Sequence, residues 1–348
     1  MITVSVSDRA GASAAYHVRP GERLLHAGLA AGIGLPYECA TGTCGSCKAT
    51  VLEGSVRTLW DEAPGRRVCR RPGEFLMCQA TGANQALALA IPTAFREARA
   101  PAVQARRGVA SAFHPLTGEI GCFSVVCDEP VDHLPGQFML LSAPGVEGGR
   151  AYSMTGHAPG TRRLDFLVRL KPGGALSPAL FADRLAEHEV ELFGPLGRAV
   201  LREEDDRPFL AIAGGSGLAG VLSIVEAALA RGLFARSPSR LVFGLRRMAG
   251  SYMLDRLSDA VRRSGAGLRV TVAFSDEEAD ARFRANYPDL GFAHGLAHEV
   301  ARQELMPAGG EVPICFVAGP PAMVDAAMRM LVVEARVSPT EIRYDRFG

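Results

Sequence analysis

Four cysteines carry the clearest chemistry in this chain of 348 residues. Cys39, Cys44 and Cys47 share one short stretch, and Cys78 follows from a separate part of the sequence. A plant-type 2Fe-2S cluster takes three thiolate ligands from one loop and the fourth from a separate segment, which is the spacing found here. The residues between the cysteines are small, so backbone N–H groups can turn toward the sulfur atoms. The chain is therefore predicted to hold single electrons at this loop.

The same cysteines have three other interpretations. A structural zinc site has no use for Cys39, and a redox pair of Cys44 and Cys47 needs a strand-to-helix context that is missing here. The third alternative is buried thiols without a function. We favour the cluster. The remaining four cysteines lie scattered in mostly apolar surroundings and are expected to pack in cores: Cys69, Cys122, Cys127 and Cys315.

A glycine-rich turn is the second candidate site. Gly215, Gly217 and Gly220 match G-x-G-x-x-G between a predicted strand and a predicted helix. Glycine lets the backbone approach a pyrophosphate, and the helix N-terminus offers it partial positive charge. A plain strand-to-helix turn is the alternative. The next strand ends at Arg246 and Arg247, which could meet a 2′-phosphate or a ribose, so the sequence predicts a nucleotide site for NADH or NADPH.

Two further stretches could hold a ring and a phosphate. Arg150, Tyr152 and Ser153 begin a predicted strand, where an arginine fork can grip a pyrophosphate and an aromatic followed by a hydroxyl can hold a ring. The alternative is an edge strand with a surface arginine. The second stretch is Gly173–Ser177, in which Ser177 is expected to cap a helix that has Pro178 at its first position.

Apolar patterns predict three domains that position these sites. Residues 1–92 contain short strands and one helix, and their Phe75–Cys78 stretch is expected to be a strand that carries the last ligand. Residues 93–106 are rich in Ala and Arg and are interpreted as a linker. Residues 107–203 have evenly spaced strands between Pro and Gly, which predicts an antiparallel barrel. In residues 204–348 short strands alternate with helices, which predicts a doubly wound parallel sheet.

Composition excludes several classes of partner. Lys and Arg number 38 and Asp and Glu 37, so neither nucleic acid nor an anionic membrane surface is expected as a partner. No stretch approaches the roughly 18 apolar residues of a membrane-spanning helix, and the N-terminal residues lack the apolar core of a signal peptide. The cysteines show no disulfide framework. A cytoplasmic protein is therefore expected, and a monomer is the default because the sequence leaves the oligomeric state open.

Taken in order, these motifs resemble those of the FAD and 2Fe-2S reductases of bacterial multicomponent oxygenases. The resemblance covers nearly the whole chain and includes the Ala318–Pro321 turn. It implies a β-grasp ferredoxin domain, a six-stranded flavin-binding barrel and a ferredoxin reductase-like NAD(P)H domain. The chain departs from the family at Ala318, often a cysteine, at Gly220, often a proline, and at Gly348, which extends past an aromatic.

The resemblance also implies which residues hold each group. The 2Fe-2S ligands are Cys39, Cys44, Cys47 and Cys78. The FAD contacts are Arg150, Tyr152, Ser153, Leu167, Val168, Arg169, Gly174, Ala175, Leu176, Ser177 and a flavin-covering Phe347. The NAD(P)H contacts are Gly214, Gly215, Ser216, Gly217, Arg246, Gly319 and Pro320.

The three groups belong together for a physical reason. A nicotinamide gives up two electrons as a hydride, an iron-sulfur cluster accepts one, and a flavin can do both. The expected function is a reductase that passes electrons from NADH through FAD and the cluster to a Rieske-type ferredoxin or a diiron hydroxylase, within a hydrocarbon monooxygenase system. Two alternatives remain, the reductase of a Rieske ring-hydroxylating dioxygenase and a redox sensor without turnover. No catalytic acid, base or nucleophile is expected.

Overall fold

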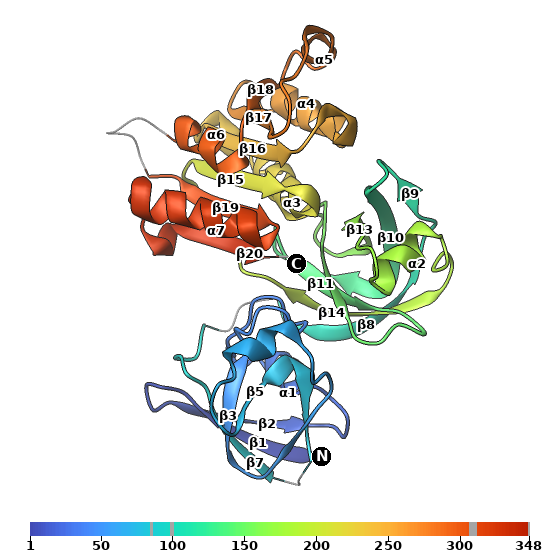
Figure 1. Ribbon diagram of the computed structural model, residues 1–348, viewed down its shortest axis with the longest axis vertical. Coiled ribbons are helices and arrows are strands. Elements are labelled where there is room, and N and C mark those ends of the chain that lie inside the picture. Colours follow the sequence, from blue (N-terminus) through green and yellow to red (C-terminus); the bar gives the residue numbers. More distant parts are fainter. Residues whose placement is uncertain (84–85, 98–100, 306–311, 347–348) are drawn as a thin grey trace. The chain divides into compact units, whose positions relative to one another are not determined.

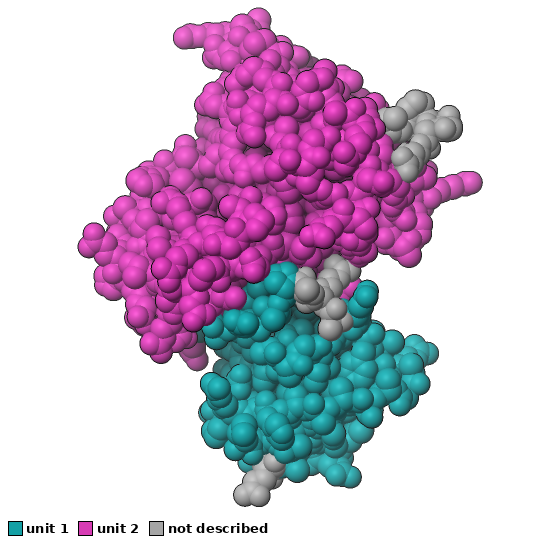
Figure 2. Space-filling model, turned by 180° about the vertical axis from the view of Figure 1, so that it is seen from behind, with its two compact units in different colours: residues 1–105, 148–151, 193–195 teal, residues 106–147, 152–192, 196–348 magenta. Residues whose placement is uncertain are grey.

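The computed structural model describes residues 1–83, 86–97, 101–305 and 312–346. These residues form two compact units, shown separately in colour in Figure 2. The first contains residues 1–105, 148–151 and 193–195, and the second contains the rest. The first unit holds a small mixed sheet, and the second holds an antiparallel half-barrel and a parallel sheet. The three predicted folds are confirmed, whereas their residue boundaries remain a prediction.

The N-terminal sheet has the strand order β2-β1-β7-β3-β5. Strand β1 pairs antiparallel with β2 and parallel with β7, so a hairpin flanks a parallel central pair. Val4 and Val6 are buried while Thr3 and Ser5 are exposed, which is the period of two expected of a half-buried strand. The predicted hairpin and helix are therefore present. The strands are β1 (Ile2–Ser7), β2 (Ser13–Val18), β3 (Lys48–Glu53), β4 (Val56–Thr58), β5 (Glu74–Leu76), β6 (Ala80–Gly82) and β7 (Ala86–Ala90), and the helices are α1 (Leu24–Ala30), η1 (Pro64–Val68) and η2 (Met77–Gln79).

The half-barrel has the strand order β12-β11-β14-β8-β10-β13, with β9 paired to β10. Its long strand β10 pairs antiparallel with both β8 and β13. Phe123 and Phe166 stack in its core with ring centroids 5.3 Å apart. The elements are β8 (Gln104–Ala110), β9 (His114–Pro115), β10 (Ile120–Val131), β11 (Phe138–Ser142), β12 (Arg150–Ser153), β13 (Thr161–Arg169), α2 (Leu176–Phe181) and β14 (Glu189–Leu196).

The parallel sheet has the order β18-β17-β16-β15-β19-β20, and helices cover both of its faces (Figure 1). Along β15, Phe209 and Ala211 pack in a core with α3 and α4, and Leu210 and Ile212 pack in a second core with α6 and α7. This alternation makes the sheet doubly wound. Within the described residues, no helix is long and apolar enough to span a bilayer.

The parallel-sheet domain comprises the following elements. The strands are β15 (Phe209–Gly214), β16 (Ser239–Leu245), β17 (Leu268–Phe274), β18 (Gly291–His294), β19 (Ile314–Gly319) and β20 (Ile342–Arg346). The helices are η3 (Gly215–Gly217), α3 (Leu218–Ala230), η4 (Leu233–Ala235), η5 (Met248–Gly250), α4 (Leu254–Arg263), α5 (Ala281–Asn286), α6 (Ala297–Glu304), α7 (Pro321–Arg329), η6 (Met330–Glu334) and η7 (Pro339–Glu341).

Two local predictions are wrong. Cys78 lies in the 3₁₀ turn η2 and not on the preceding strand, which ends at Leu76. Ser177 is not the cap of α2, because the helix already begins at Leu176. The Ser177 hydroxyl instead accepts a hydrogen bond of 2.9 Å from the backbone N–H of Lys171, so it orders the loop before the helix.

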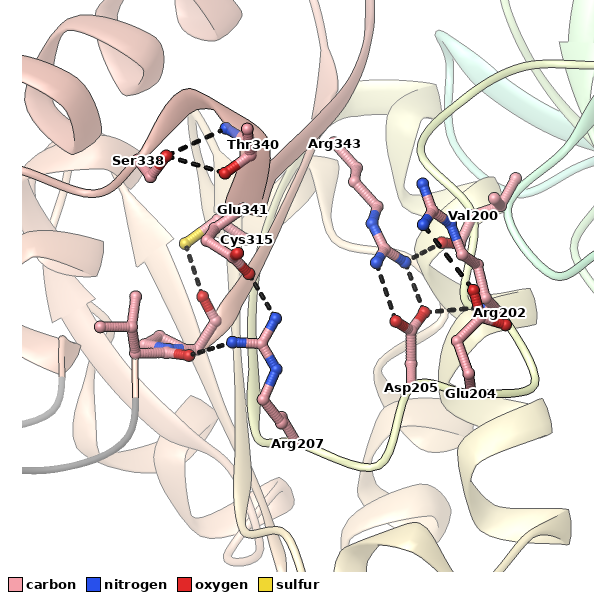
Figure 3. A network of polar contacts seen from close by, with 12 residues as sticks. Val200, Arg202, Glu204, Asp205, Arg207, Cys315, Ser338, Thr340, Glu341 and Arg343 are labelled. Carbon is pink, nitrogen blue, oxygen red and sulfur yellow. Dashed lines mark hydrogen bonds and ion pairs between the residues drawn. The ribbon is translucent and has the colours of Figure 1, made fainter. Parts of the chain in front are cut away.

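A buried ion pair joins the segment after the half-barrel to the last strand of the parallel sheet (Figure 3). Arg343 on β20 donates from Nη2 to Oδ1 of Asp205 at 2.8 Å and from Nη1 to the carbonyl of Val200 at 2.7 Å. Asp205 also accepts the backbone N–H of Arg202 at 2.6 Å. The side chains of Arg343 and Asp205 are only 11% and 6% exposed. The pair therefore fixes β20 against the connection between the two folds.

Breaking this pair should destabilise the second unit. Burial raises the pKa of Asp205, but its hydrogen bonds from Arg343 and Arg202 outweigh burial and lower it overall. The pair should therefore stabilise fully above the unfolded carboxyl pKa of about 3.9, and its contribution should disappear as pH falls through the lower folded value. We expect Arg343→Met to cost about 3 kcal/mol at pH 7, measured by urea unfolding of the holo-protein.

The matched control is Arg302→Met. Arg302 pairs with Glu334 at 3.1 Å, with side chains 65% and 44% exposed, so its loss should matter little. An equal effect of the two substitutions would contradict a special role for Arg343.

Candidate functional site

The four predicted cluster ligands come together in the first unit as two pairs. The Sγ atoms of Cys39 and Cys44 lie 3.2 Å apart, and Cys47 is hydrogen-bonded to Cys78. Among the described residues, no three His, Cys, Asp or Glu side chains gather around the position of a single metal ion. A 2Fe-2S cluster has two iron atoms, each with two cysteine ligands, so two adjacent thiol pairs fit this group.

The backbone of the cysteine loop turns its N–H groups toward sulfur, as the small residues led us to expect. The N–H groups of Thr41 and Cys44 point at Sγ of Cys39, each at 3.4 Å. Gly42 and Gly45 have φ values of 91° and 87°, the left-handed region that glycine enters most easily. Hydrogen bonds, first of all from Cys44, lower the pKa of Cys39 to about 4. The same hydrogen bond raises the pKa of Cys44, so this pair shares one negative charge before iron binds.

Strand β12 brings the arginine, aromatic and hydroxyl of the predicted flavin site onto one short element. The Arg150 guanidinium donates to the carbonyls of Gly148 and Gly149 at 3.2 and 3.1 Å. Tyr152 meets Phe123 edge to face at 6.3 Å, and Ser153 is buried. Ser153 faces the opposite side of the strand from Tyr152 and lies beside Gly220 of α3.

The other predicted flavin contacts differ in what they can offer. Leu167 and Val168 are buried in hydrophobic cores, so only their backbone could meet a ring. Arg169 is exposed and pairs with Glu119 at 3.0 Å. Gly174 and Ala175 precede α2, and Leu176 and Ser177 are its first two residues. Phe347 lies outside the described residues.

The predicted nucleotide turns meet at the carboxyl ends of β15 and β19. These strands are neighbours at the point where the strand order reverses, the usual ligand site of open parallel sheets. A Cβ on Gly217 would lie 2.3 Å from the Ala318 carbonyl oxygen, and one on Gly319 would lie 3.0 Å from that of Gly214. Glycine is thus required because the two turns touch. Ser216 and Pro320 complete the turns.

The remaining motif residues surround this point. Gly220, the third glycine of the motif, lies within α3, where a Cβ would be 3.3 Å from the Gly136 carbonyl oxygen of the half-barrel. Arg246 and Arg247 follow β16 and share one carboxylate, Asp276, at 4.0 and 3.8 Å. Their net positive charge could meet a ribose edge or a 2′-phosphate.

Comparison with known proteins matches all three folds to families. The 2Fe-2S iron-sulfur cluster binding domain family matches residues 8–81, the oxidoreductase FAD-binding domain family 120–200, and the oxidoreductase NAD-binding domain family 211–329. The ferredoxin–NAD(+) reductase component of the alkene monooxygenase system of Xanthobacter autotrophicus is 34% identical, covering 95% of this chain and 97% of that protein. The chain belongs to the reductase components of bacterial multicomponent oxygenases.

Two further comparisons agree with this assignment. The ferredoxin–NAD(P)(+) reductase CarAd of Metapseudomonas resinovorans is 33% identical over 94% of this chain and 95% of that protein. The solved ferredoxin reductase in carbazole 1,9a-dioxygenase superposes with a TM-score of 0.81 at 30% identity, covering 99% of this chain and 98% of that one. This reductase is therefore an oxidoreductase with 2Fe-2S, FAD and NAD(P)-binding domains.

Sequence reasoning missed three side chains that order these sites. Arg23 donates from Nη1 to the carbonyl of Cys78 at 2.6 Å. His26 hydrogen-bonds the backbone of Ala40, beside the first ligand, and burial followed by the charge of Arg23 lowers its pKa to about 3, so it stays neutral. Tyr252 donates its buried hydroxyl to the Gly215 carbonyl at 2.6 Å. None belongs to a local motif, so no sequence signal identified them.

The hydroxyl of Tyr252 should matter for nucleotide binding. Tyr252→Phe leaves the Gly215 carbonyl without this donor and loosens the glycine turn. A lost hydrogen bond of about 1 kcal/mol corresponds to a roughly fivefold rise in KM for NADH, with flavin content unchanged. Steady-state kinetics with ferricyanide would measure it, and Tyr287→Phe is the control, because Tyr287 in the same domain is only partly buried. An unchanged KM would show that the turn does not depend on Tyr252.

Proposed function

We propose that this reductase serves a diiron hydrocarbon monooxygenase, passing electrons from NADH or NADPH to a Rieske-type ferredoxin or to the hydroxylase itself. The observation that carries the proposal is the cysteine loop, whose N–H groups already face the sulfur atoms. In sequence, this loop and the terminal YDRFG resemble the reductase of toluene 4-monooxygenase. The 34% identity to an alkene monooxygenase reductase supports the same class of system.

Each site of the chain has a separate task in this proposal. Cys39, Cys44, Cys47 and Cys78 hold the 2Fe-2S cluster, and the inward N–H groups stabilise its negative charge. The residues of β12 and the turn before α2 hold FAD, which when bound accepts a hydride and releases electrons singly. The turns Gly214–Gly217 and Gly319–Pro320, with Arg246, hold the pyridine nucleotide at the sheet edge. No side chain has to move a proton.

The proposed localisation of this reductase is the cytoplasm. Pyridine nucleotides are available there, and the reducing environment keeps the cysteine ligands as thiols. All eight cysteines are free of disulfide bonds, which agrees with such a compartment.

Loss of one ligand should separate the two halves of the electron path. We expect Cys44→Ser to reduce NADH-dependent reduction of cytochrome c to background, while ferricyanide reduction, which takes electrons from flavin, persists. The matched control is Cys69→Ser, because Cys69 is a half-buried thiol close enough to feel the charge of Cys47 without being a predicted ligand. Equal loss of both activities in Cys44→Ser would contradict the order of flavin before cluster.

The oxygenase class is tested by reconstitution. With NADH and this reductase, a diiron hydroxylase and its Rieske ferredoxin should oxidise toluene or an alkene at a rate that depends on reductase concentration. A Rieske ring-hydroxylating dioxygenase with its own ferredoxin is the comparison. Faster coupled turnover with the dioxygenase would reverse the proposal, since a dioxygenase reductase shares the same three folds.

A further inference from the structure

The segment between β4 and β5 packs directly on the cysteine loop. The N–H of Gly65 donates to the carbonyl of Gly42 at 2.8 Å, and a Cβ on Gly65 would lie 2.7 Å from that oxygen. A Cβ on Gly45, between Cys44 and Cys47, would lie 2.9 Å from a methyl of Val68. Helix η1 therefore covers the predicted cluster site. Its residues contact Gly42 and Gly45, which lie between the cysteine ligands.

The outer side of this segment carries excess positive charge. Arg67, Arg70 and Arg71 are exposed, and within the described parts of the chain their side chains make no ion pair. The acidic groups nearby offset only part of this charge. Glu74 pairs with Lys48 at 3.0 Å and accepts the backbone N–H groups of Arg70 and Arg71. In addition, Asp61, whose side chain is 84% exposed, lies 3.7 Å from the guanidinium of Arg66 and offsets its charge, and Glu62 is a second exposed acid of the segment.

The same segment exposes the single tryptophan of the chain. Trp60 is 40% exposed, although large apolar side chains are usually buried. It follows Leu59, whose N–H donates at 2.8 Å to the carbonyl of Gln79, the residue after Cys78. A hollow of about 390 Å³ is lined by Arg70 and Arg71 together with residues of β3 and β7, and Trp60 is not part of its lining. Trp and Arg are the residue types that dominate binding energy at protein interfaces.

We propose that Trp60, Arg67, Arg70 and Arg71, here called the basic patch, dock an acidic one-electron acceptor protein. The proposal rests on the proposed function, because it takes the cluster as the point of electron exit. One electron passes from the reduced cluster to the oxidised acceptor, and no bond or proton changes place. A positive surface beside the donor attracts a carboxylate-rich face and raises the encounter rate, by roughly 10-fold to 1000-fold at low salt.

Two forms of one acceptor test the charge preference. Horse cytochrome c is basic, and its succinylated form carries the same haem on an acidic surface. The patch variant is Arg67→Glu/Arg71→Glu, and the control with the same charge change is Arg9→Glu/Arg19→Glu, two exposed arginines of the β1–β2 hairpin region. We expect the patch variant to reduce succinylated cytochrome c at least about tenfold more slowly at low salt, and the control variant to match the wild type.

The other measurements separate docking from damage to the cluster. Native cytochrome c should be reduced by the patch variant as fast as by the wild type or faster, and the wild-type preference for the acidic form should weaken as salt rises. If the patch variant reduced both cytochromes equally slowly, the arginines would act on the reduction potential of the cluster and not on docking, and the proposal would be overturned. An unchanged rate with succinylated cytochrome c would also overturn it. If the wild type reduced neither cytochrome although its flavin was reduced by NADH, the proposed function itself would fail.

Discussion

Negative charge has to be stabilised at two sites of this chain, the cysteine loop and the nucleotide turns, and backbone dipoles do this at both. At the cysteine loop, N–H groups lie 3.4 Å from sulfur, and left-handed glycines make that turn possible. At the sheet edge, Gly217 and Gly319 bring two turns so close that no Cβ fits between them. Both sites need exposed N–H groups next to an anion, a cluster in one case and a pyrophosphate in the other. Small residues are therefore concentrated at the two sites.

Such loops need support from outside, because a turn rich in glycine has few side chains of its own to fix it. Arg23, which directly precedes α1, holds the last ligand, and His26 on α1 holds the cysteine loop. Gly65 and Val68 of η1 also pack on the cysteine loop, against Gly42 and Gly45. Tyr252 performs the same task for the glycine turn. Arg23, His26 and Tyr252 each hold a backbone carbonyl with a side chain, and Gly65 holds one with its backbone N–H, which leaves the N–H groups of the loops free to face the anion.

This division explains what the sequence could predict. The cysteine spacing, the glycine motif and the alternation of strands with helices are local patterns, and each indicated its site or fold. Tyr252, Arg23 and the Asp205–Arg343 pair act across long stretches of chain, 138 residues for the ion pair, so no local pattern contains them. Ser177 and Cys78 were misplaced by a residue or two, because apolar patterns do not fix the end of a strand or the start of a helix.

The last strand links the nucleotide turn to the half-barrel. Arg346 pairs in register with Gly319, so the end of β20 lies beside the turn proposed to hold the nicotinamide nucleotide. Three residues earlier, Arg343 binds Asp205 and the Val200 carbonyl, and Asp345 accepts the N–H of Arg198 at 3.4 Å. The buried ion pair therefore does more than contribute stability: it holds β20 against the connection after the half-barrel, and with it Arg346 beside the nucleotide turn.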